Sequence, residues 1–423
     1  MNRRQFLTTT GLMGLMLTGY AAQKYWPRPG LTNPCLTGLP ARLQHHPLMQ
    51  QIWVGIDATQ VWDSHVHLVG TGDSGIHQNV DEYHADVWFN PNMDSYSHPI
   101  LKLQKYFYMN GACADNAHVD TSTVNRMVDL IAEMPAGFKA MLFAFDWFHD
   151  ENGKPNKDNS TFFISNQYAA KVAITHSQYF EWVASIHPYR ADAIDALQAA
   201  HAQGARAIKW LPSGMGIDPM SAKCDAFYKS THDLNMPIIS HTGREKAVLG
   251  GNQDDSNPLR MRRALDAGVR VVLAHCASDG DDVDLDNTKV GQARQKDRVL
   301  STDLFARLMD TPKYNHLLVG EISGLTLFNH AKALKPILQR TDWHHRLLSG
   351  SDYPLPGIMP FISLAQLVNA GLLQESSVSF LNDLRIYNPL LFDFALKRLI
   401  SFNGNSFPAS VFETRRFFDA TPV

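Results

Sequence analysis

The stretch Val61-Trp62-Asp63-Ser64-His65-Val66-His67-Leu68 sets the first expectation for the fold. It reads as a β-strand in which His65 and His67 are two residues apart, so both side chains point to the same face. Two imidazoles on one face can bind one metal ion together. Asp63 shares that face, where its carboxylate would orient a histidine ring. A chance histidine pair would give the same pattern, so the other strands decide between the two interpretations.

Seven further apolar runs follow, and segments with helix-forming composition lie between them. The runs span residues 138–145, 182–187, 205–211, 237–241, 269–274, 317–322 and 346–349. The helical segments include 191–202, 222–234 and 258–267, of which the first and the last are followed by glycine, a favoured helix stop. Eight strands alternating with helices predict an α/β fold, a (β/α)8 TIM barrel.

Three connections are long and polar: residues 70–121, 146–161 and 278–298. We expect them to be irregular insertions in the βα-loops, acting as lids, binding loops or flexible segments. Residues 26–60 would lead into a barrel that spans 61–358. A C-terminal helical extension would occupy 359–423.

The N-terminus carries an export signal of recognisable type. Asn2-Arg3-Arg4-Gln5-Phe6-Leu7 resembles the twin-arginine motif, a short apolar stretch follows, and small residues come next. The apolar stretch is shorter than the ~20 residues that span a membrane. We therefore predict a twin-arginine signal peptide over residues 1–25, the twin-arginine export machinery as a partner, and a periplasmic or exported protein. Retention of the signal as a membrane tether is the alternative.

The composition fits a globular protein that binds small molecules. Of 423 residues, 44% are hydrophobic and 19% charged, and the formal net charge is −3. No basic cluster follows the N-terminus, which argues against a nucleic-acid partner. The four cysteines form no CxxC pair, so a disulfide in an exported protein and four free thiols both stay open. A homo-oligomer also stays open.

Four chemically active residues stand where apolar runs end. Lys209, His241, His275 and Asp352 each stand near the end of a predicted strand or just after it, where the run gives way to glycine, proline or polar residues. In a parallel barrel the C-terminal ends of all strands meet at one rim, where active sites lie. Together with the histidine pair, these residues predict one site built from five strands.

The motifs taken together resemble the amidohydrolase superfamily, and within it the amidohydrolase-related branch of metal-dependent TIM-barrel hydrolases and decarboxylases. They cover most of the chain after the signal. The supporting stretches are Asp63-Ser64-His65-Val66-His67, Ile186-His187-Pro188-Tyr189-Arg190, Gly204-Ala205-Arg206-Ala207-Ile208-Lys209-Trp210-Leu211-Pro212, His241-Thr242-Gly243, Leu273-Ala274-His275-Cys276 and Gly350-Ser351-Asp352-Tyr353-Pro354. One barrel supports many chemistries, so the resemblance does not name a substrate.

The resemblance implies that His65, His67, His241 and Asp352 bind a divalent metal. Three imidazoles and a carboxylate suit Zn²⁺, with Mn²⁺, Fe²⁺ or Co²⁺ as alternatives. Asp352 would also take a proton from water and pass it to the leaving group. His275 would polarise the substrate carbonyl or stabilise an oxyanion.

The number of metal ions depends on Lys209. In binuclear relatives a carboxylated lysine at this position bridges two ions, and His241 and His275 bind the second. In some mononuclear relatives a lysine here faces the substrate as a cation. We favour one metal.

Three more residues have open roles. Arg190 and Arg244 follow strand ends, and each would either bind a substrate carboxylate or form a surface ion pair. Glu321 would either support a metal ligand or pair with Lys209.

Three functions compete at this stage. The first is a hydrolase that cleaves a C–O or C–N bond of a lactone, ester or amide. The second is a metal-dependent decarboxylase of an aromatic or unsaturated acid. The third is an exported binding protein without catalysis, which would normally have lost a metal ligand. None of the expected ligands is missing, so we predict a metal-dependent hydrolase acting on a small molecule.

Overall fold

Eight parallel strands form the centre of the computed structural model, which describes residues 30–75, 86–245, 248–287 and 298–419. Each coincides with one of the predicted apolar runs, within a few residues. The strands are β1 (Trp62–His67), β3 (Lys139–Phe143), β5 (Phe180–Val183), β6 (Ile208–Trp210), β7 (Ile238–His241), β8 (Val271–Ala274), β11 (Leu318–Glu321) and β12 (Leu347–Leu348). Buried parallel strands read as near-continuous apolar runs, which explains why the sequence located them.

The strand order is that of a (β/α)8 barrel. One sheet runs β1-β3-β5 and the other β6-β7-β8-β11-β12, with every pairing parallel. Isolated parallel bridges join the two sheets at both seams, Ala184 to Ile208 and Val66 to Tyr353. The Asp352 N–H donates to the His65 carbonyl at 2.8 Å across the second seam.

Side-chain alternation decides what faces the inside of the barrel. Successive strand residues point to opposite faces, so a residue two positions after an inward-facing one also points inward. Ala207, Ile239 and Val319 belong to a small buried cluster inside the barrel. Lys209, His241 and Glu321 lie two positions further along the same strands. The pleat therefore directs these polar side chains to the barrel interior, near its C-terminal end.

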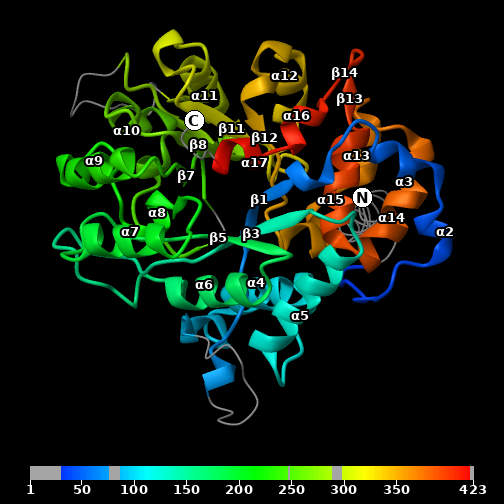
Figure 1. Cartoon of the computed structure of the whole chain (residues 1–423), viewed down its shortest axis with the longest axis horizontal. Helices are drawn as coiled ribbons and strands as arrows, with labels where there is room; N and C mark the ends of the chain where they lie inside the picture. Colours follow the sequence, from blue (N-terminus) through cyan, green and yellow to red (C-terminus); the bar gives the residue numbers. More distant parts are fainter. Residues whose placement is uncertain (1–29, 76–85, 246–247, 288–297, 420–423) are drawn as a thin grey trace, which may run out of the picture.

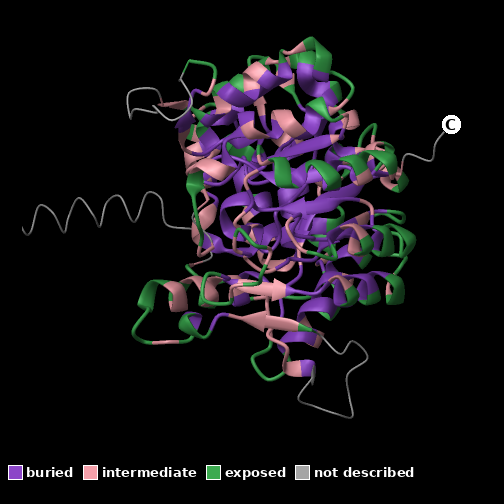
Figure 2. Ribbon diagram, turned by 90° about the vertical axis from the view of Figure 1, so that its left-hand side faces the viewer, coloured by how far each residue is buried: buried purple, intermediate pink, exposed green. Residues whose placement is uncertain are grey.

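Helices surround the strands, and the strands are buried at the centre (Figures 1 and 2). The helices around the barrel are α5 (Val119–Ala132), α6 (Asn166–Thr175), α7 (Ala193–Ala202), α8 (Pro212–Met215), α9 (Asp225–Asp233), α10 (Arg262–Asp266), α11 (Ser301–Met309) and α12 (Leu334–Gln339). Their apolar side chains and the outward-facing strand residues make up the larger part of the core.

A helical group follows the last strand and lies beside the start of the chain (Figure 1). It contains α13 (Leu364–Asn369), α14 (Val378–Tyr387), α15 (Pro389–Leu399), a hairpin of β13 (Ser401–Phe402) and β14 (Asn405–Ser406), α16 (Ala409–Phe412) and α17 (Arg415–Phe418). The N-terminal helices α2 (Ala41–Gln44) and α3 (Pro47–Ile52) pack against it. Trp53 stacks on Phe394 with ring centroids 4.2 Å apart. The predicted C-terminal helical extension is present, and its division from the barrel at residue 359 stays a prediction.

The long connections are less irregular than predicted. The stretch 70–121 contains the strand β2 (Val87–Phe89) and the helix α4 (Pro99–Gly111), so the expectation of an irregular loop was wrong there. β2 pairs with β4 (Phe162–Ile164) in an antiparallel ribbon. Most of 146–161 lacks regular structure, as predicted. In the third connection β9 (Asp281–Val283) pairs with β10 (Arg298–Leu300), and residues 288–297 lie outside the described part.

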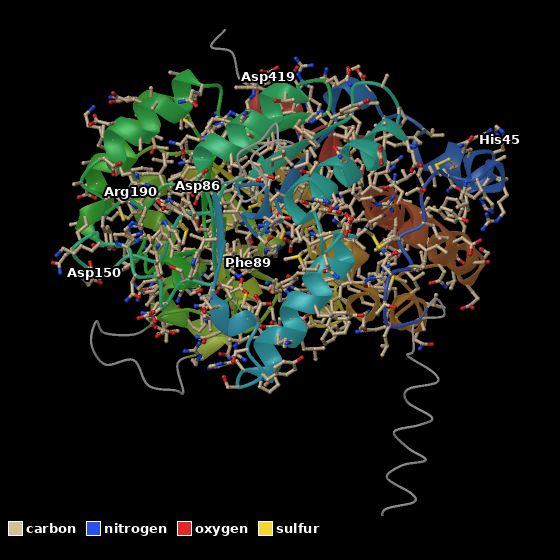
Figure 3. The ribbon with its side chains drawn as sticks, turned by 90° about the horizontal axis from the view of Figure 1, so that it is seen from below. His45, Asp86, Phe89, Asp150, Arg190 and Asp419 are labelled. Atoms are coloured by element: carbon tan, nitrogen blue, oxygen red, sulfur yellow. A yellow bond between two sulfur atoms is a disulfide. The ribbon has the colours of Figure 1, made fainter. Side chains whose placement is uncertain are left out.

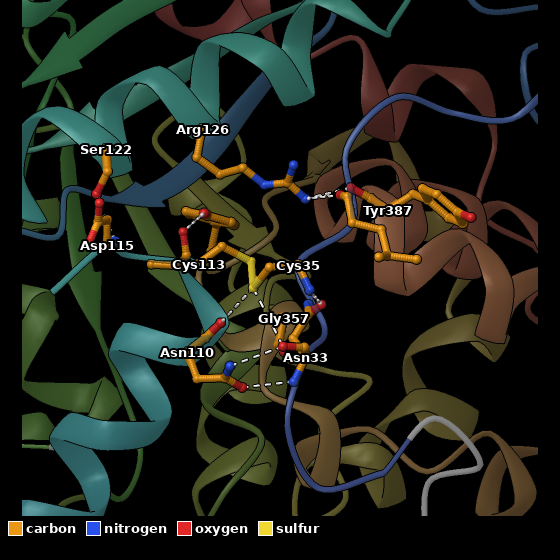
Figure 4. The surroundings of a disulfide bond; sticks show 12 residues. Asn33, Cys35, Asn110, Cys113, Asp115, Ser122, Arg126, Gly357 and Tyr387 are labelled. Carbon is orange, nitrogen blue, oxygen red and sulfur yellow. Dashed lines mark hydrogen bonds between the residues drawn. A yellow bond between two sulfur atoms is a disulfide. The ribbon is translucent and has the colours of Figure 1, made fainter.

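A disulfide ties the beginning of the described chain to the end of α4 (Figure 4). Cys35 and Cys113 are bonded, whereas Cys224 and Cys276 are free and buried. Asn33 supports the junction, because its N–H donates to Asn110 Oδ1 at 2.8 Å and its carbonyl accepts from Asn110 Nδ2 at 3.1 Å. Of the two alternatives that the sequence left open, a disulfide and four free thiols, the structure shows the disulfide.

The predicted signal peptide falls within residues 1–29, which lie outside the described residues. Among the residues that are described, no helix has both the length and the apolar character needed to span a bilayer.

Candidate metal centre

The C-terminal ends of the strands open into a cavity of about 490 Å³. Its floor contains the six residues that the sequence placed at the barrel rim, and the structure brings all of them together. They are His65, His67, Lys209, His241, His275 and Asp352. They come from β1, β6, β7, the residue directly after β8 and the loop after β12. Residues up to 287 positions apart in the sequence therefore share one site because parallel strands end at one rim.

Asp352 joins the two histidines of β1. Its Oδ1 atom lies 3.4 Å from His65 Nε2 and 3.2 Å from His67 Nε2. A charge-assisted hydrogen bond between such groups is shorter, about 2.7–2.9 Å. Ligand atoms about 2.0–2.1 Å from a tetrahedral zinc ion are about 3.3–3.4 Å from one another. The observed separations match ligands that share one metal ion better than they match direct hydrogen bonds.

Glu321 orients His65. Its Oε2 atom accepts a hydrogen bond from His65 Nδ1 at 2.8 Å, and both side chains are fully buried. Burial lowers the pKa of His65 well below its ordinary value, so the ring is neutral. With the proton on Nδ1, Nε2 has a free lone pair, which lies 3.1 Å from Lys209 Nζ and 3.4 Å from Asp352 Oδ1. A carboxylate behind a metal-binding histidine fixes the ring in this way, which is the supporting role among the two left open for Glu321.

Gly350 makes room for this contact. A Cβ atom at that position would lie 2.0 Å from Glu321 Oε1 and 2.6 Å from the Cβ of His65. Any other residue would push the glutamate away from the histidine. The glycine in Gly350-Ser351-Asp352 is thus explained by close packing behind the site.

His241 has a buried donor atom without a hydrogen bond. Its Nε2 atom finds no hydrogen-bond partner among the described residues and lies 3.4 Å from Glu245 Oε2. Burial lowers the pKa of His241 to about 3, so this ring is neutral as well. A buried polar atom without a partner is costly, and a bound metal ion would satisfy it.

His275 has a defined tautomer. Its Nδ1 atom lies 3.0 Å from the Ser323 carbonyl oxygen, which can only accept, so Nδ1 carries the proton. Burial lowers the pKa of His275 to about 3. The other ring nitrogen is then a bare lone pair, suited to binding a metal or accepting a proton. A neutral His275 in this tautomer cannot donate to an oxyanion, so that predicted role requires its protonation.

The backbone is strained at two of these positions. His275 has φ of 58° and Asp352 has φ of 60°, a region that residues other than glycine seldom adopt. Such conformations cluster at functional sites, where the surrounding structure enforces them. Burial alone would raise the pKa of Asp352, but His65, His275 and His67 around it lower that pKa well below its ordinary value.

Lys209 is completely buried on the floor. Its Nζ atom lies 3.1 Å from His65 Nε2 and 4.9 Å from the centre of the Phe143 ring. Burial lowers the pKa of Lys209 to about 8, although Glu321 and Asp352 act in the opposite direction. Within the described part of the chain it forms no ion pair, so the amine remains available to the site.

Arg190 forms ion pairs, one of the two roles left open for it, whereas Asp63 does not have the role expected of it. Arg190 lies outside this cavity, and its guanidinium is bound to Asp146 at 2.8 Å and to Asp192 at 2.7 Å. In Figure 3 it lies towards the same side of the molecule as Asp150, opposite His45. Asp63 accepts the N–H groups of His65 and Ser351, so it aligns two backbones and does not orient an imidazole.

Arg244 does reach the cavity. It lines the rim with a side chain that is about half exposed, and its Nη2 lies 3.8 Å from Asp281 Oδ1. This separation leaves the guanidinium only loosely held.

Several site residues had not been singled out from the sequence. Ser323 donates to Glu321 Oε2 at 2.8 Å and lies 2.9 Å from His275 Nδ1, so it connects the two supported histidines. Its position two residues after Glu321 was a usable signal. Glu245, four residues after His241, offered a weaker one. Tyr108 comes from α4, in the stretch expected to be irregular.

The similarities to known proteins lie among solved structures. No family model matches the chain, and no curated protein matches it either. The similar structures include an uncharacterized TIM-barrel protein from Bordetella bronchiseptica. It has 15% identity and a TM-score of 0.45, and the match covers 75% of this chain and 93% of that one.

Two further structures have assigned names. A probable 2-pyrone-4,6-dicarboxylic acid hydrolase from Acinetobacter baumannii has 14% identity and a TM-score of 0.42, covering 78% of this chain and 96% of that one. A 5-carboxyvanillate decarboxylase from Novosphingobium aromaticivorans, solved with bound manganese, has 10% identity and a TM-score of 0.41, covering 79% and 97%. At these values the likenesses fix neither reaction nor substrate for this chain.

Proposed function

We propose that this protein is a metal-dependent hydrolase that cleaves a C–O or C–N bond of a small lactone, ester or amide. The observation that carries the proposal is the meeting of His65, His67, His241 and Asp352 at the floor of one cavity. Their donor atoms are imidazole nitrogens and a carboxylate oxygen, and the distances from Asp352 Oδ1 to the Nε2 atoms of His65 and His67 are those expected of ligands around one ion.

The donor set indicates which metals would bind. Three imidazoles and one carboxylate suit Zn²⁺, and Mn²⁺, Fe²⁺ or Co²⁺ are the alternatives. A divalent ion held there would lower the pKa of a water molecule and so supply a nucleophile at neutral pH.

Asp352 is the proposed proton carrier. In the reaction, the water oxygen bonds to the acyl carbon and the acyl C–O or C–N bond breaks. Asp352 Oδ2 would accept the proton that the water loses and deliver it to the leaving oxygen or nitrogen. Glu321 and Ser323 would keep His65 and His275 in fixed tautomers during the cycle.

The number of ions remains part of the proposal. A second ion would bind His241 and the bare nitrogen of His275, and would share a carboxylated Lys209 with the first. A single ion, which the sequence favoured, would leave Lys209 as a cation facing the substrate.

Lys209 also supports a second candidate function, a decarboxylase of an aromatic or unsaturated acid. A buried cation next to the proposed metal ligands could hold a substrate carboxylate. Hydrolysis is preferred because Asp352 is available as a proton acceptor.

Export through the twin-arginine pathway is proposed from the N-terminal motif. The Cys35–Cys113 disulfide supports it, because such bonds persist in oxidising compartments such as the periplasm.

The test is metal analysis of the purified protein, combined with turnover assays on lactones, esters, amides and aromatic acids. Metal-dependent release of acid from a lactone, ester or amide supports the proposal. Release of CO₂ from an aromatic acid without any hydrolysis favours the decarboxylase. Absence of metal and of turnover contradicts both.

A further inference from the structure

The walls of the cavity differ from its floor. Above the metal-ligand residues, the lining consists mainly of aromatic and aliphatic side chains. They include Phe89 and Phe162 of the β2–β4 ribbon, Leu103 and Phe107 of α4, and Phe328 and Phe361 of the loops after β11 and β12. One end of the cavity is therefore polar, and the rest is apolar.

The apolar lining continues to the rim, where water reaches it. Ile100 is 73% exposed, Leu103 55% and Phe328 55%, and all three line the cavity. Large apolar side chains grouped at the mouth of a cavity are unfavourable in water and mark places where apolar ligands bind. Their exposure is unexplained by the core of the protein, to which none of them belongs.

The sequence of α4 places the apolar groups on one side. Ile100, Leu103 and Phe107 follow the spacing of a single helix face. The cations of the same helix are held elsewhere, since Lys105 Nζ binds Asp94 Oδ2 at 2.7 Å and Lys102 Nζ binds the Asp94 carbonyl at 3.1 Å. The face that lines the cavity thus stays free of charge.

The charges around the cavity argue against a highly charged ligand. Among the described lining residues there are two cations, Lys209 and Arg244, and three carboxylates, Glu245, Asp279 and Asp352. A divalent ion held at the floor would change this balance to an excess of one positive charge, which is less than a substrate with several carboxylates would need. An uncharged molecule with an apolar body faces no such penalty.

We infer that the substrate is an uncharged lactone or ester carrying an alkyl or aryl substituent. Its reactive carbonyl lies at the polar floor, and the substituent extends past Phe107 and Leu103 to the rim at Ile100 and Phe328. A cavity of about 490 Å³ accommodates a molecule of this kind. This substrate class rests on the proposed hydrolase function.

The test compares δ-valerolactone with its pentyl-substituted homologue, δ-decalactone. Each fully buried CH₂ group is worth about fourfold in affinity, so kcat/KM should be about 10- to 1,000-fold higher for the homologue. Ile100→Gln and Leu103→Gln should each reduce that preference, measured as the ratio of the two kcat/KM values, by about fivefold or more. Ile174→Gln is the matched control, because Ile174 is 63% exposed on α6 and lies outside the cavity lining.

A binding assay separates this inference from the hydrolase proposal. The fluorescent probe 1-anilinonaphthalene-8-sulfonate should bind the wild type and the control, and bind Leu103→Gln more weakly. If neither lactone is hydrolysed but the probe shows this dependence, the hydrolase proposal fails and the apolar ligand site stands. Equal kcat/KM for both lactones, or preference for a dicarboxylated lactone, overturns the apolar substrate class. Probe affinity that is identical in all variants overturns it too.

Discussion

Lys209 and Lys397 are both completely buried, yet their surroundings differ. Lys397 Nζ donates to the Gly350 carbonyl at 2.6 Å and to Asp393 Oδ2 at 2.5 Å, so its charge is paired and hydrogen-bonded. Lys209 Nζ lies next to His65 Nε2 and over the Phe143 ring, without an ion pair in the described part of the chain. Buried charges are normally paired, and an exception indicates function.

The buried cations of the C-terminal helices stabilise the structure, whereas the buried cation of the cavity floor is available for chemistry. Lys397 belongs to α15 and holds Gly350, two residues before Asp352, from outside the barrel. Arg385 of α14 acts in a similar way, since its guanidinium donates to four carbonyl groups between Pro356 and Ile362. The C-terminal helices thus fix the backbone on both sides of Asp352, while His241 Nε2 on the cavity floor has no hydrogen-bond partner among the described residues.

The largest expected effect is a loss of turnover on replacing Asp352, on the cavity floor. Asp352→Asn keeps the shape and one oxygen ligand but removes the proton acceptor, so turnover should fall by about 10²–10⁴-fold. Part of the metal and the fold should be retained, because three imidazoles remain. Steady-state kinetics and metal content measured on one preparation check this. Turnover close to that of the wild type would rule out Asp352 as the proton carrier.

Replacing Lys397 by methionine should reduce stability, whereas replacing Lys209 by methionine should reduce turnover. Lys397→Met leaves the Asp393 carboxylate and the Gly350 carbonyl unpaired, and should lower the free energy of unfolding by about 3–5 kcal/mol. Lys209→Met removes an unpaired buried charge and should not reduce stability, yet it should abolish turnover. Denaturant unfolding and kinetics of both variants test the comparison. An equal loss of stability in the two variants would contradict the distinction between a structural Lys397 and a chemically active Lys209.

A smaller effect, on metal affinity, is expected at Glu321, which holds the metal ligand His65. Glu321→Gln preserves size but weakens the hold on the His65 tautomer, so metal affinity should fall by about 10–100-fold. A chelator titration measures this. Asp63→Asn offers a control on the strand of His65, because Asp63 accepts the backbone N–H groups of His65 and Ser351 and does not contact the imidazole. An unchanged affinity in Glu321→Gln would show that the glutamate does not tune the ligand.

A pH dependence of stability is expected from Asp393, the partner of Lys397. Burial raises the pKa of Asp393 to about 7, although Lys397 lowers it. Between about pH 4 and 7 the folded protein therefore binds a proton that the unfolded chain releases. Stability should fall as pH rises through this window, by at most about 1.4 kcal/mol per unit, and level off above it. Asp393→Asn should lack this part of the slope in unfolding measured across the window; an unchanged slope would contradict it.

Much of the fold could be predicted because the information is local. Each barrel strand is a short apolar run, and the chemically active residues stand near the ends of these runs. Side-chain alternation along the strands and the common rim of the barrel therefore predicted that these residues lie together. Helix α4 was missed because its aromatic residues follow a polar segment without a clear helix start. The ion pair of Arg190 could not be predicted, because its partner Asp146 is 44 residues away and no local pattern contains such a tertiary contact. The pairing of Cys35 with Cys113 also depends on the folded arrangement.

The central claim is that His65, His67, His241 and Asp352 hold a divalent metal ion. Its most direct test is elemental analysis of the wild type and of a His65→Ala/His241→Ala double variant, each purified without chelators and checked for folding by circular dichroism. The account predicts at least about one equivalent of a divalent transition metal in the wild type and little in the folded double variant. A folded, metal-free and active wild type would contradict it, as would a double variant that keeps its full metal content.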